Sequence, residues 1–408
     1  MHFKRFLTLI LIPGAIFSQK IDDNALKSLV AKTQETHSSA LTIYFDDKLI
    51  FNQCFDSLYS PLDAMSCTKS FVNLGIGFLI SNGKIQSIDD PVYKYYPEWN
   101  QGLKKKITIR NLLNHTSGIQ SLPNTAEIYR SPDYVQFALT ADMVDTPGAK
   151  FVYNNKAVNI LAGIIEKASG ERMDNYIRDN IFKPLDIHNF YWQTDTYRYE
   201  GLKDTSDLSR GNPIAMAELM IKAEDMAKIG LLVLHNGNFN GAQIIQKKWI
   251  EESMKPSQAY NHTCGLLWWL IYDPVTLPVS FTDSNINILK AIKLNDTLIN
   301  ALLKAKGHYK SIAQFSAKVD SVMSSQKLGD IHTIIIELRK KNYFVEFYNA
   351  DYSNAKIIGY AARGYLGQYI DIFPEKKLVV VRTIRSQNYK SASDEFDDFD
   401  LMSLNIVR

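Results

Sequence analysis

The chain has 408 residues, of which 46 % are hydrophobic and 12 % aromatic, and its formal net charge is +3. This length and apolar content exclude a minimal or disordered domain and suit one large domain or two lobes. The near-neutral charge argues against nucleic-acid binding. An odd set of three cysteines excludes a disulfide framework and allows at most one disulfide. We expect Cys54, Cys67 and Cys264 to be small apolar residues.

The first 18 residues have the composition of a secretory signal. Lys4 and Arg5 give a basic start, an apolar stretch runs from 6 to 17, and Ser18 is a small residue at the expected cleavage point. No later apolar run is long enough to span a membrane. The sequence therefore predicts a signal peptide over 1–18 and an exported protein, periplasmic or extracellular, without a membrane span.

Segments near both ends of the chain predict one antiparallel sheet. Asp22 to Asn24 can cap a helix, after which alternating apolar residues read as a β-hairpin. Further alternating segments near the other end include two that are joined by the turn 374–377. The predicted strands are 41–45, 49–51, 356–361, 368–373 and 378–384.

The middle of the chain, about 88–260, has mostly helical periodicity, with helices predicted at 109–113, 158–168 and 224–234. An extra segment at about 275–350 differs, because 286–306 reads as a Lys-rich helix and 331–347 alternates like strands. Its pattern is compatible with a lid, a partner surface or a packing element. The fold class is α+β, with helices flanking a sheet lobe (about 24–87 and 350–408) and a mostly helical lobe (about 88–260) inserted.

Ser66 and Lys69 stand at the start of a stretch that we expect to form a buried apolar helix, which the pair Asn82-Gly83 ends. Residues three apart lie on one face of a helix, so the hydroxyl and the ammonium point into the same space. A nucleophile and its base need this arrangement. The alternative is a solvated first turn with an exposed lysine. Cys67 is a poorer nucleophile candidate, because the residue three positions on is Ser70, which cannot act as a base.

Tyr153 and Asn155 follow the turn signal Pro147-Gly148 and so lie on a loop. Free lysine and tyrosine both titrate at a pH of about 10, so neither is an effective base at neutral pH unless its surroundings change its pKa. Tyr153 beside Lys69 could share one proton with it and activate Ser66, while the amide of Asn155 holds Lys69 and a substrate carbonyl. The alternative for Tyr153 and Asn155 is an ordinary turn.

In this order the motifs resemble the serine β-lactamase and penicillin-binding-protein superfamily, in the branch of class C β-lactamases, carboxypeptidases, esterases and 6-aminohexanoate-dimer hydrolases. The resemblance implies a β-lactamase/transpeptidase-like serine hydrolase domain over 19–408. It implies catalysis by Ser66, Lys69 and Tyr153 with Asn155 binding substrate, and a structural role for His115. The matching segments are Ser66–Lys69, Leu112–Gly118, Pro147–Gly148, Tyr153–Asn155, Asp225–Ala227 and Gly265–Trp269.

The family's third motif, Lys-Thr-Gly or His-Thr-Gly, is missing, and Gly359 and Tyr360 stand in place of its cation and hydroxyl. A main-chain amide near Ala361 or Ala362 can still complete an oxyanion hole with that of Ser66. Arg363 is either a replacement cation for substrate or a salt-bridge partner within the sheet. The loss of the motif favours an ester or small amide over a β-lactam.

These inferences predict an exported serine hydrolase that forms an acyl-enzyme on Ser66, an esterase or small-peptide amidase. One alternative is a β-lactamase or D-alanyl-D-alanine carboxypeptidase, and another is a catalytically silent sensor or binding protein. The expected partner is a small ester, amide or peptide substrate, and not nucleic acid. Scattered histidines without metal-ligand spacing predict neither a metal ion nor a cofactor.

Overall fold

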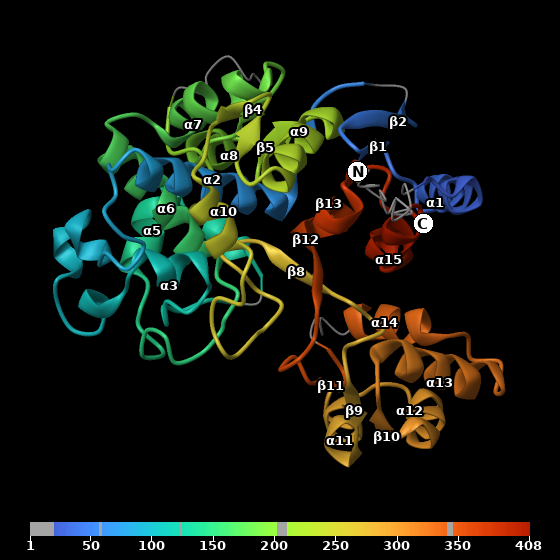
Figure 1. Ribbon diagram of the computed structural model, residues 1–408. Coiled ribbons are helices and arrows are strands. Elements are labelled where there is room, and N and C mark those ends of the chain that lie inside the picture. Colours follow the sequence, from blue (N-terminus) through green and yellow to red (C-terminus); the bar gives the residue numbers. More distant parts are fainter. Residues whose placement is uncertain (1–19, 57–58, 123, 202–209, 341–345) are drawn as a thin grey trace, which may run out of the picture.

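The computed structural model describes residues 20–56, 59–122, 124–201, 210–340 and 346–408 (Figure 1). The segment predicted as a signal peptide, 1–18, lies outside these residues. Within the described part of the chain, no helix has the length and apolar character needed to cross a bilayer.

A six-stranded sheet combines both ends of the chain, and all its neighbouring strands are antiparallel. Together with the helices around it, this sheet confirms the predicted α+β fold. From edge to edge its strands are β2 (Lys48–Cys54), β1 (Ala40–Phe45), β14 (Leu378–Thr383), β13 (Gln368–Phe373), β12 (Ile357–Gly364) and β8 (Trp269–Tyr272).

The two central strands, β13 and β14, are buried along their whole length. Side chains alternate between the faces of a strand, so Val379 and Val381 join the large core of the middle helices, whereas Leu378 and Val380 join a second core. The second core lies against the terminal helices α1 (Asp23–Glu35) and α15 (Phe399–Asn405), which are close together in Figure 1. Helices therefore cover both faces of the sheet.

Helix α2 (Thr68–Ser81) is buried on nearly all sides, which explains its almost continuous apolar sequence. It ends at the predicted stop, with Asn82 as its C-cap. Gly77 allows α10 (Lys247–Ser253) to pack closely, because a Cβ atom at this position would lie 2.1 Å from Nε1 of Trp249. The helices in the middle of the chain are α3 (Ile109–Leu113), α4 (Ala126–Tyr129), α5 (Tyr134–Thr140), α6 (Asn155–Ser169), α7 (Met173–Ile177), α8 (Asp195–Glu200), α9 (Ala223–Leu234) and α10.

The extra segment has its own hydrophobic cluster. Two predictions for it were wrong. The stretch 331–347 contains helix α14 (Ile331–Lys340) instead of strands, because Ile331, Ile334, Ile335 and Leu338 follow the helical spacing i, i+3, i+4, i+7. The stretch 286–306 is not one helix, since Asn295 caps a new one. The other elements of the extra segment are β9 (Val279–Phe281), α11 (Asp283–Ala291), α12 (Asp296–Leu302), β10 (Gly307–Tyr309), α13 (Ile312–Ser324) and β11 (Asn349–Ala350).

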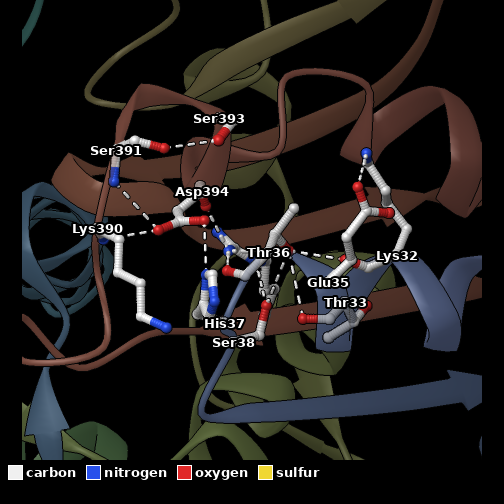
Figure 2. A network of polar contacts seen from close by, with 11 residues as sticks. Lys32, Thr33, Glu35, Thr36, His37, Ser38, Lys390, Ser391, Ser393 and Asp394 are labelled. Atoms are coloured by element: carbon white, nitrogen blue, oxygen red, sulfur yellow. Dashed lines mark hydrogen bonds and ion pairs between the residues drawn. The ribbon is translucent and has the colours of Figure 1, made fainter.

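A polar network joins the end of α1 to the C-terminal region (Figure 2). Nδ1 of His37 lies 2.8 Å from Oδ1 of Asp394, and Figure 2 shows the two side chains facing each other. The buried guanidinium of Arg382 on β14 donates to Oγ of Ser38 (2.7 Å) and to the carbonyl of Gly367 (2.7 Å). His37 and Ser38 lie more than 300 positions before their partners Asp394 and Arg382, so these contacts fix the two chain ends against each other.

Candidate active site

Ser66 lies in the 3-10 turn Met65–Cys67, which leads directly into α2. The preceding strand β3 (Leu62–Asp63) pairs with β5 (Leu219–Ile221), which in turn pairs with β4 (Tyr191–Trp192). Met65 has a φ of 49°, so the backbone bends sharply just before the serine. The serine is thus presented at the start of a rigid, buried helix.

Lys69 follows Ser66 by one turn, and its Nζ lies 2.8 Å from the Oγ of Ser66. The same Nζ donates to the carbonyl oxygen of Met216 at 2.6 Å. Lys69 is only 3 % exposed, and this burial lowers its pKa to about 7, although nearby Cys67 and Asp63 act in the opposite direction. A large share of the lysine is therefore neutral at physiological pH, with a lone pair available beside the hydroxyl.

Tyr153, on the loop before α6, brings its ring against Lys69, with Nζ 5.1 Å from the ring centroid. The ring also contacts His115 (centroids 4.5 Å apart) and stacks on Trp269 (6.4 Å). Burial raises the pKa of Tyr153, although a side-chain hydrogen bond with Ser66 lowers it in part. Tyr153 is therefore a neutral phenol at pH 7, and the structure favours Lys69 over Tyr153 as the proton acceptor.

Asn155 is the first residue of α6, so it lies at the start of a helix and not on the loop, where it was expected. Its Oδ1 is buried without a hydrogen-bond partner in the described chain, and the acceptor for Lys69 is the carbonyl of Met216. Asn159, one turn further along α6, accepts from the N–H of Met216 at 3.0 Å. An asparagine of α6 thus acts on Lys69 indirectly, by fixing the main chain at Met216.

The end of β12 borders the same space. Ala361 is paired on both sides, with Trp269 and Asp371, and Ala362 is paired with Ile370. Strand β8 begins at Trp269, so β12 continues past its end, and Arg363 reaches the cleft that contains Ser66. At Gly364 the main chain of β12 lies close to the residue before the serine turn, since an added Cβ atom would lie 2.6 Å from the carbonyl oxygen of Ala64.

Arg363 is a salt-bridge partner within the sheet, the second of its two expected roles. Its guanidinium pairs with the fully buried Asp371 of β13, lies 3.7 Å from Oδ2 of Asp400 and stacks over the ring of Tyr369. Burial raises the pKa of Asp371 while Arg363 lowers it. The cation borders the cleft, but the protein's own carboxylates already compensate its charge.

His115 is a structural residue of the loop, as the resemblance implied. Its Nδ1 accepts the N–H of Asn154 at 3.2 Å. Burial, and secondarily the charge of Lys69, lowers the pKa of His115 to about 3, so the ring is neutral. No group of three or more His, Cys, Asp or Glu side chains in the described ranges is arranged to hold a metal ion.

Several of these groups line a small cleft beside Ser66 that opens to solvent. Sequence reasoning missed Met216 and Asn159. Met216 acts through its main-chain carbonyl and Asn159 acts on Lys69 only through Met216, so neither residue type offered a signal. The thiols of Cys67 and Cys264 are buried, and burial raises the pKa of both, so neither competes as a nucleophile. The lining residues are Ser66, Lys69, Ser70, His115, Tyr153, Cys264, Leu267, Trp268, Trp269 and Arg363.

The sequence and the fold are both similar to those of known proteins. The Beta-lactamase family model matches residues 34–283. Beta-lactamase-like protein 2 of Dictyostelium discoideum is 24 % identical over 283 residues, which cover 60 % of this chain and 48 % of that protein. The chain spans about half the length of the curated relatives it matches.

Solved structures share the fold. A penicillin-binding protein from Bacillus halodurans aligns with a TM-score of 0.56 at 15 % identity, covering 92 % of this chain and 98 % of that one. A penicillin-binding protein homologue from Pyrococcus abyssi aligns with a TM-score of 0.55 at 20 % identity, covering 93 % and 76 %. Because the family model covers more than half of its residues, the chain belongs to the Beta-lactamase family.

Proposed function

We propose that this protein is a serine hydrolase that cleaves an ester or small amide through an acyl-enzyme on Ser66. One observation carries the proposal, namely that Nζ of the buried Lys69 lies 2.8 Å from Oγ of Ser66 while its pKa falls to about 7. A structural lysine needs only hydrogen-bond acceptors, whereas a general base needs both the contact with the nucleophile and the lowered pKa.

In the first half-reaction, Oγ of Ser66 forms a bond to the substrate carbonyl carbon and its proton passes to the neutral Nζ of Lys69. The oxyanion accepts one hydrogen bond from the N–H of Ser66, which has no partner within the helix because it lies in the first turn. It accepts a second hydrogen bond from the main chain where β12 ends. When the bond to the leaving group breaks, the proton on Lys69 passes through the phenol of Tyr153 to the departing oxygen or nitrogen.

In the second half-reaction, water attacks the acyl carbon and gives up a proton to Lys69. The ester bond to Ser66 then breaks, the proton returns to Oγ, and the carboxylic acid product leaves. The main-chain carbonyl of Met216 supports both steps, because it holds one N–H of the amine and leaves the lone pair free for Ser66.

The surroundings of the serine favour a neutral acyl group. Arg363 already pairs with Asp371 and approaches Asp400, so binding a substrate carboxylate would compete with these contacts. Trp268, Trp269 and Tyr153 offer aromatic walls instead. Several relatives are called β-lactamases or penicillin-binding proteins, and their substrates are therefore the competing possibility for this chain.

The decisive experiment uses a fluorophosphonate probe, which should label the wild type and Ser81→Ala but not Ser66→Ala. Ser81 is a matched control, since it lies on the same helix and its Oγ donates to the carbonyl of Gly77. Equal labelling of wild type and Ser66→Ala would refute the proposal. Turnover of p-nitrophenyl acetate, nitrocefin and a D-alanyl-D-alanine peptide then separates esterase, β-lactamase and carboxypeptidase. Stoichiometric acylation without turnover would instead indicate a binding protein.

We also propose that the protein is exported, on the basis of the signal-like composition of residues 1–18. Cell fractionation tests this, with the N-terminus of the mature chain read by mass spectrometry. A chain retained in the cytoplasm with residues 1–18 intact would contradict export.

A further inference from the structure

One carboxylate behind the candidate active site contacts both segments that position the Ser66–Lys69 pair. Oδ1 of Asp63 accepts the N–H of Met65 at 2.7 Å and the N–H of Glu218 at 3.0 Å. Met65 directly precedes the nucleophile. Glu218 lies two residues after Met216, whose carbonyl binds Lys69. A single oxygen atom therefore joins the serine turn to the segment that holds its base.

The backbone at both donors needs such support. Met65 has a φ of 49° and Glu218 a φ of 70°, and both are left-handed conformations that non-glycine residues seldom adopt. The two segments also meet through strand pairing of Asp63 with Met220, and the N–H of Ala64 donates to the carbonyl of Leu219 at 2.9 Å. These bonds fix the approach of the strands, and the carboxylate fixes the two strained residues next to the site.

Asp63 also carries charge close to the pair. A carboxylate near Lys69 stabilises the ammonium form, and Asp63 acts on the lysine in this direction. Asp63 faces a second buried acid, Glu218. Oε1 of Glu218 accepts a hydrogen bond from the hydroxyl of Tyr129 at 3.0 Å and lies 3.6 Å from Nε of Arg198. Burial and the charge of Glu218 raise the pKa of Asp63 to about 7. Further titratable groups near Lys69 or Asp63, among the described residues, include Cys67, His115, Tyr153, Tyr191, Cys264 and Arg363.

We propose that Asp63 is a positioning residue for acyl transfer, which holds Ser66 against Lys69 through its two main-chain contacts and tunes the lysine through its charge. This proposal rests on the proposed function. The Asp63 carboxylate accepts from Met65 and Glu218, so it acts through Met65 and through the segment 216–218. Its removal should change the rate of acylation and its pH dependence more than substrate binding.

Two substitutions separate geometry from charge. Asp63→Ala removes both contacts, and we expect the rate of Ser66 labelling and the kcat for an ester to fall by about 10- to 100-fold with little change in KM. Asp63→Asn keeps an oxygen acceptor and removes the charge, so it should restore most of the rate at high pH. Loss of the negative charge lowers the pKa of Lys69, so the midpoint of the rate–pH profile should move to lower pH.

The matched control is Asp22→Ala. Oδ1 of Asp22 also accepts two main-chain N–H groups, those of Asn24 (3.0 Å) and Ala25 (3.1 Å), but at the start of α1. This variant should be less stable and yet label at the wild-type rate.

Labelling of Asp63→Ala at the wild-type rate would overturn the inference while leaving the proposed function intact, whereas an unlabelled wild type would remove the function itself. If Asp63→Ala does not fold, the pH profile of Asp63→Asn decides. An unshifted midpoint overturns the inference, and a lowered midpoint supports it.

Discussion

Nζ of Lys69 lies 2.6 Å from the carbonyl oxygen of Met216, although the two residues are 147 positions apart in sequence. Met216 is fixed in turn by Asn159, so the direction of the amine is set by α6 as well as by α2. A neutral amine that donates one N–H to this carbonyl directs its lone pair elsewhere, and Oγ of Ser66 lies 2.8 Å away. Tertiary contacts therefore decide both the charge and the orientation of the proposed base.

The acylation rate should rise with pH and level off above a midpoint near 7. Burial lowers the pKa of Lys69 to about 7, and only the neutral amine can accept the proton of Ser66, so the rate follows the deprotonated fraction. Fluorophosphonate labelling of the wild type between pH 5 and pH 9 measures this profile. Lys69→Arg, which stays charged, should lose about 10²- to 10⁴-fold at every pH. A flat profile in the wild type would contradict the role of Lys69.

Arg363→Met should destabilise the protein by about 3–5 kcal/mol, because it leaves the buried carboxylate of Asp371 without its cation. Without Arg363 the folded-state pKa of Asp371 lies further above its unfolded value. The variant should therefore be most stable at low pH, where Asp371 takes up a proton, and lose stability as the pH rises. Urea unfolding at pH 5 and pH 8 tests this, with Arg363→Met/Asp371→Leu as the matched double variant. Equal loss in the single and double variants would show that the ion pair is not the cause.

Asp394→Asn should cost about 1.5–3 kcal/mol at neutral pH, as expected for hydrogen bonds to a charged group. Burial raises the pKa of Asp394, but hydrogen bonds from the N–H of Lys390, from His37 and from the N–H of Ser391 outweigh it and lower the pKa overall. The carboxylate therefore contributes stability above its unfolded pKa of about 3.9, and this contribution is lost as the pH falls through the lower folded value.

Urea unfolding of the wild type and Asp394→Asn from pH 7 down to pH 3 measures this difference, which should shrink at the acid end. The exposed Asp296→Asn serves as the control and should unfold like the wild type throughout. A difference that stays constant with pH would indicate that the charge of Asp394 contributes nothing.

Replacement of residues 279–350 by a short Gly-rich turn should leave a folded protein whose Ser66 is still labelled at the wild-type rate. The segment has its own hydrophobic cluster, and the N–H of Asp351 donates to the carbonyl of Pro278 at 2.9 Å, so its two ends already lie together. Since α14 also packs near the turn Ala392–Glu395, we expect a lower melting temperature without loss of the active site. Thermal unfolding and labelling measure both, and loss of labelling in a folded variant would show that the segment shapes the cleft.

Local patterns in the sequence determined much of the fold. The alternation at 41–45, 368–373 and 378–384 predicted three of the strands, and the structure confirms them as β1, β13 and β14. The spacing of Ser66 and Lys69 was sufficient to place a hydroxyl and an amine on one helix face, because that geometry depends only on the helical repeat. The same reasoning failed for α14, where a helical spacing of isoleucines was read as the alternation of strands.

Tertiary structure alone decided what surrounds that pair. Met216 contributes a main-chain carbonyl, which has no residue-type signature, and Asp63 acts on the N–H groups of two strained residues. The salt bridge of Arg363, one of its two expected roles, depends on the pairing of β12 with β13, which brings Asp371 near it. Burial, charge pairing and long-range main-chain contacts arise when distant segments pack together, and these are the factors that set the pKa of Lys69. The sequence by itself therefore determined which groups could react, and packing decided the protonation and direction that would let them do so.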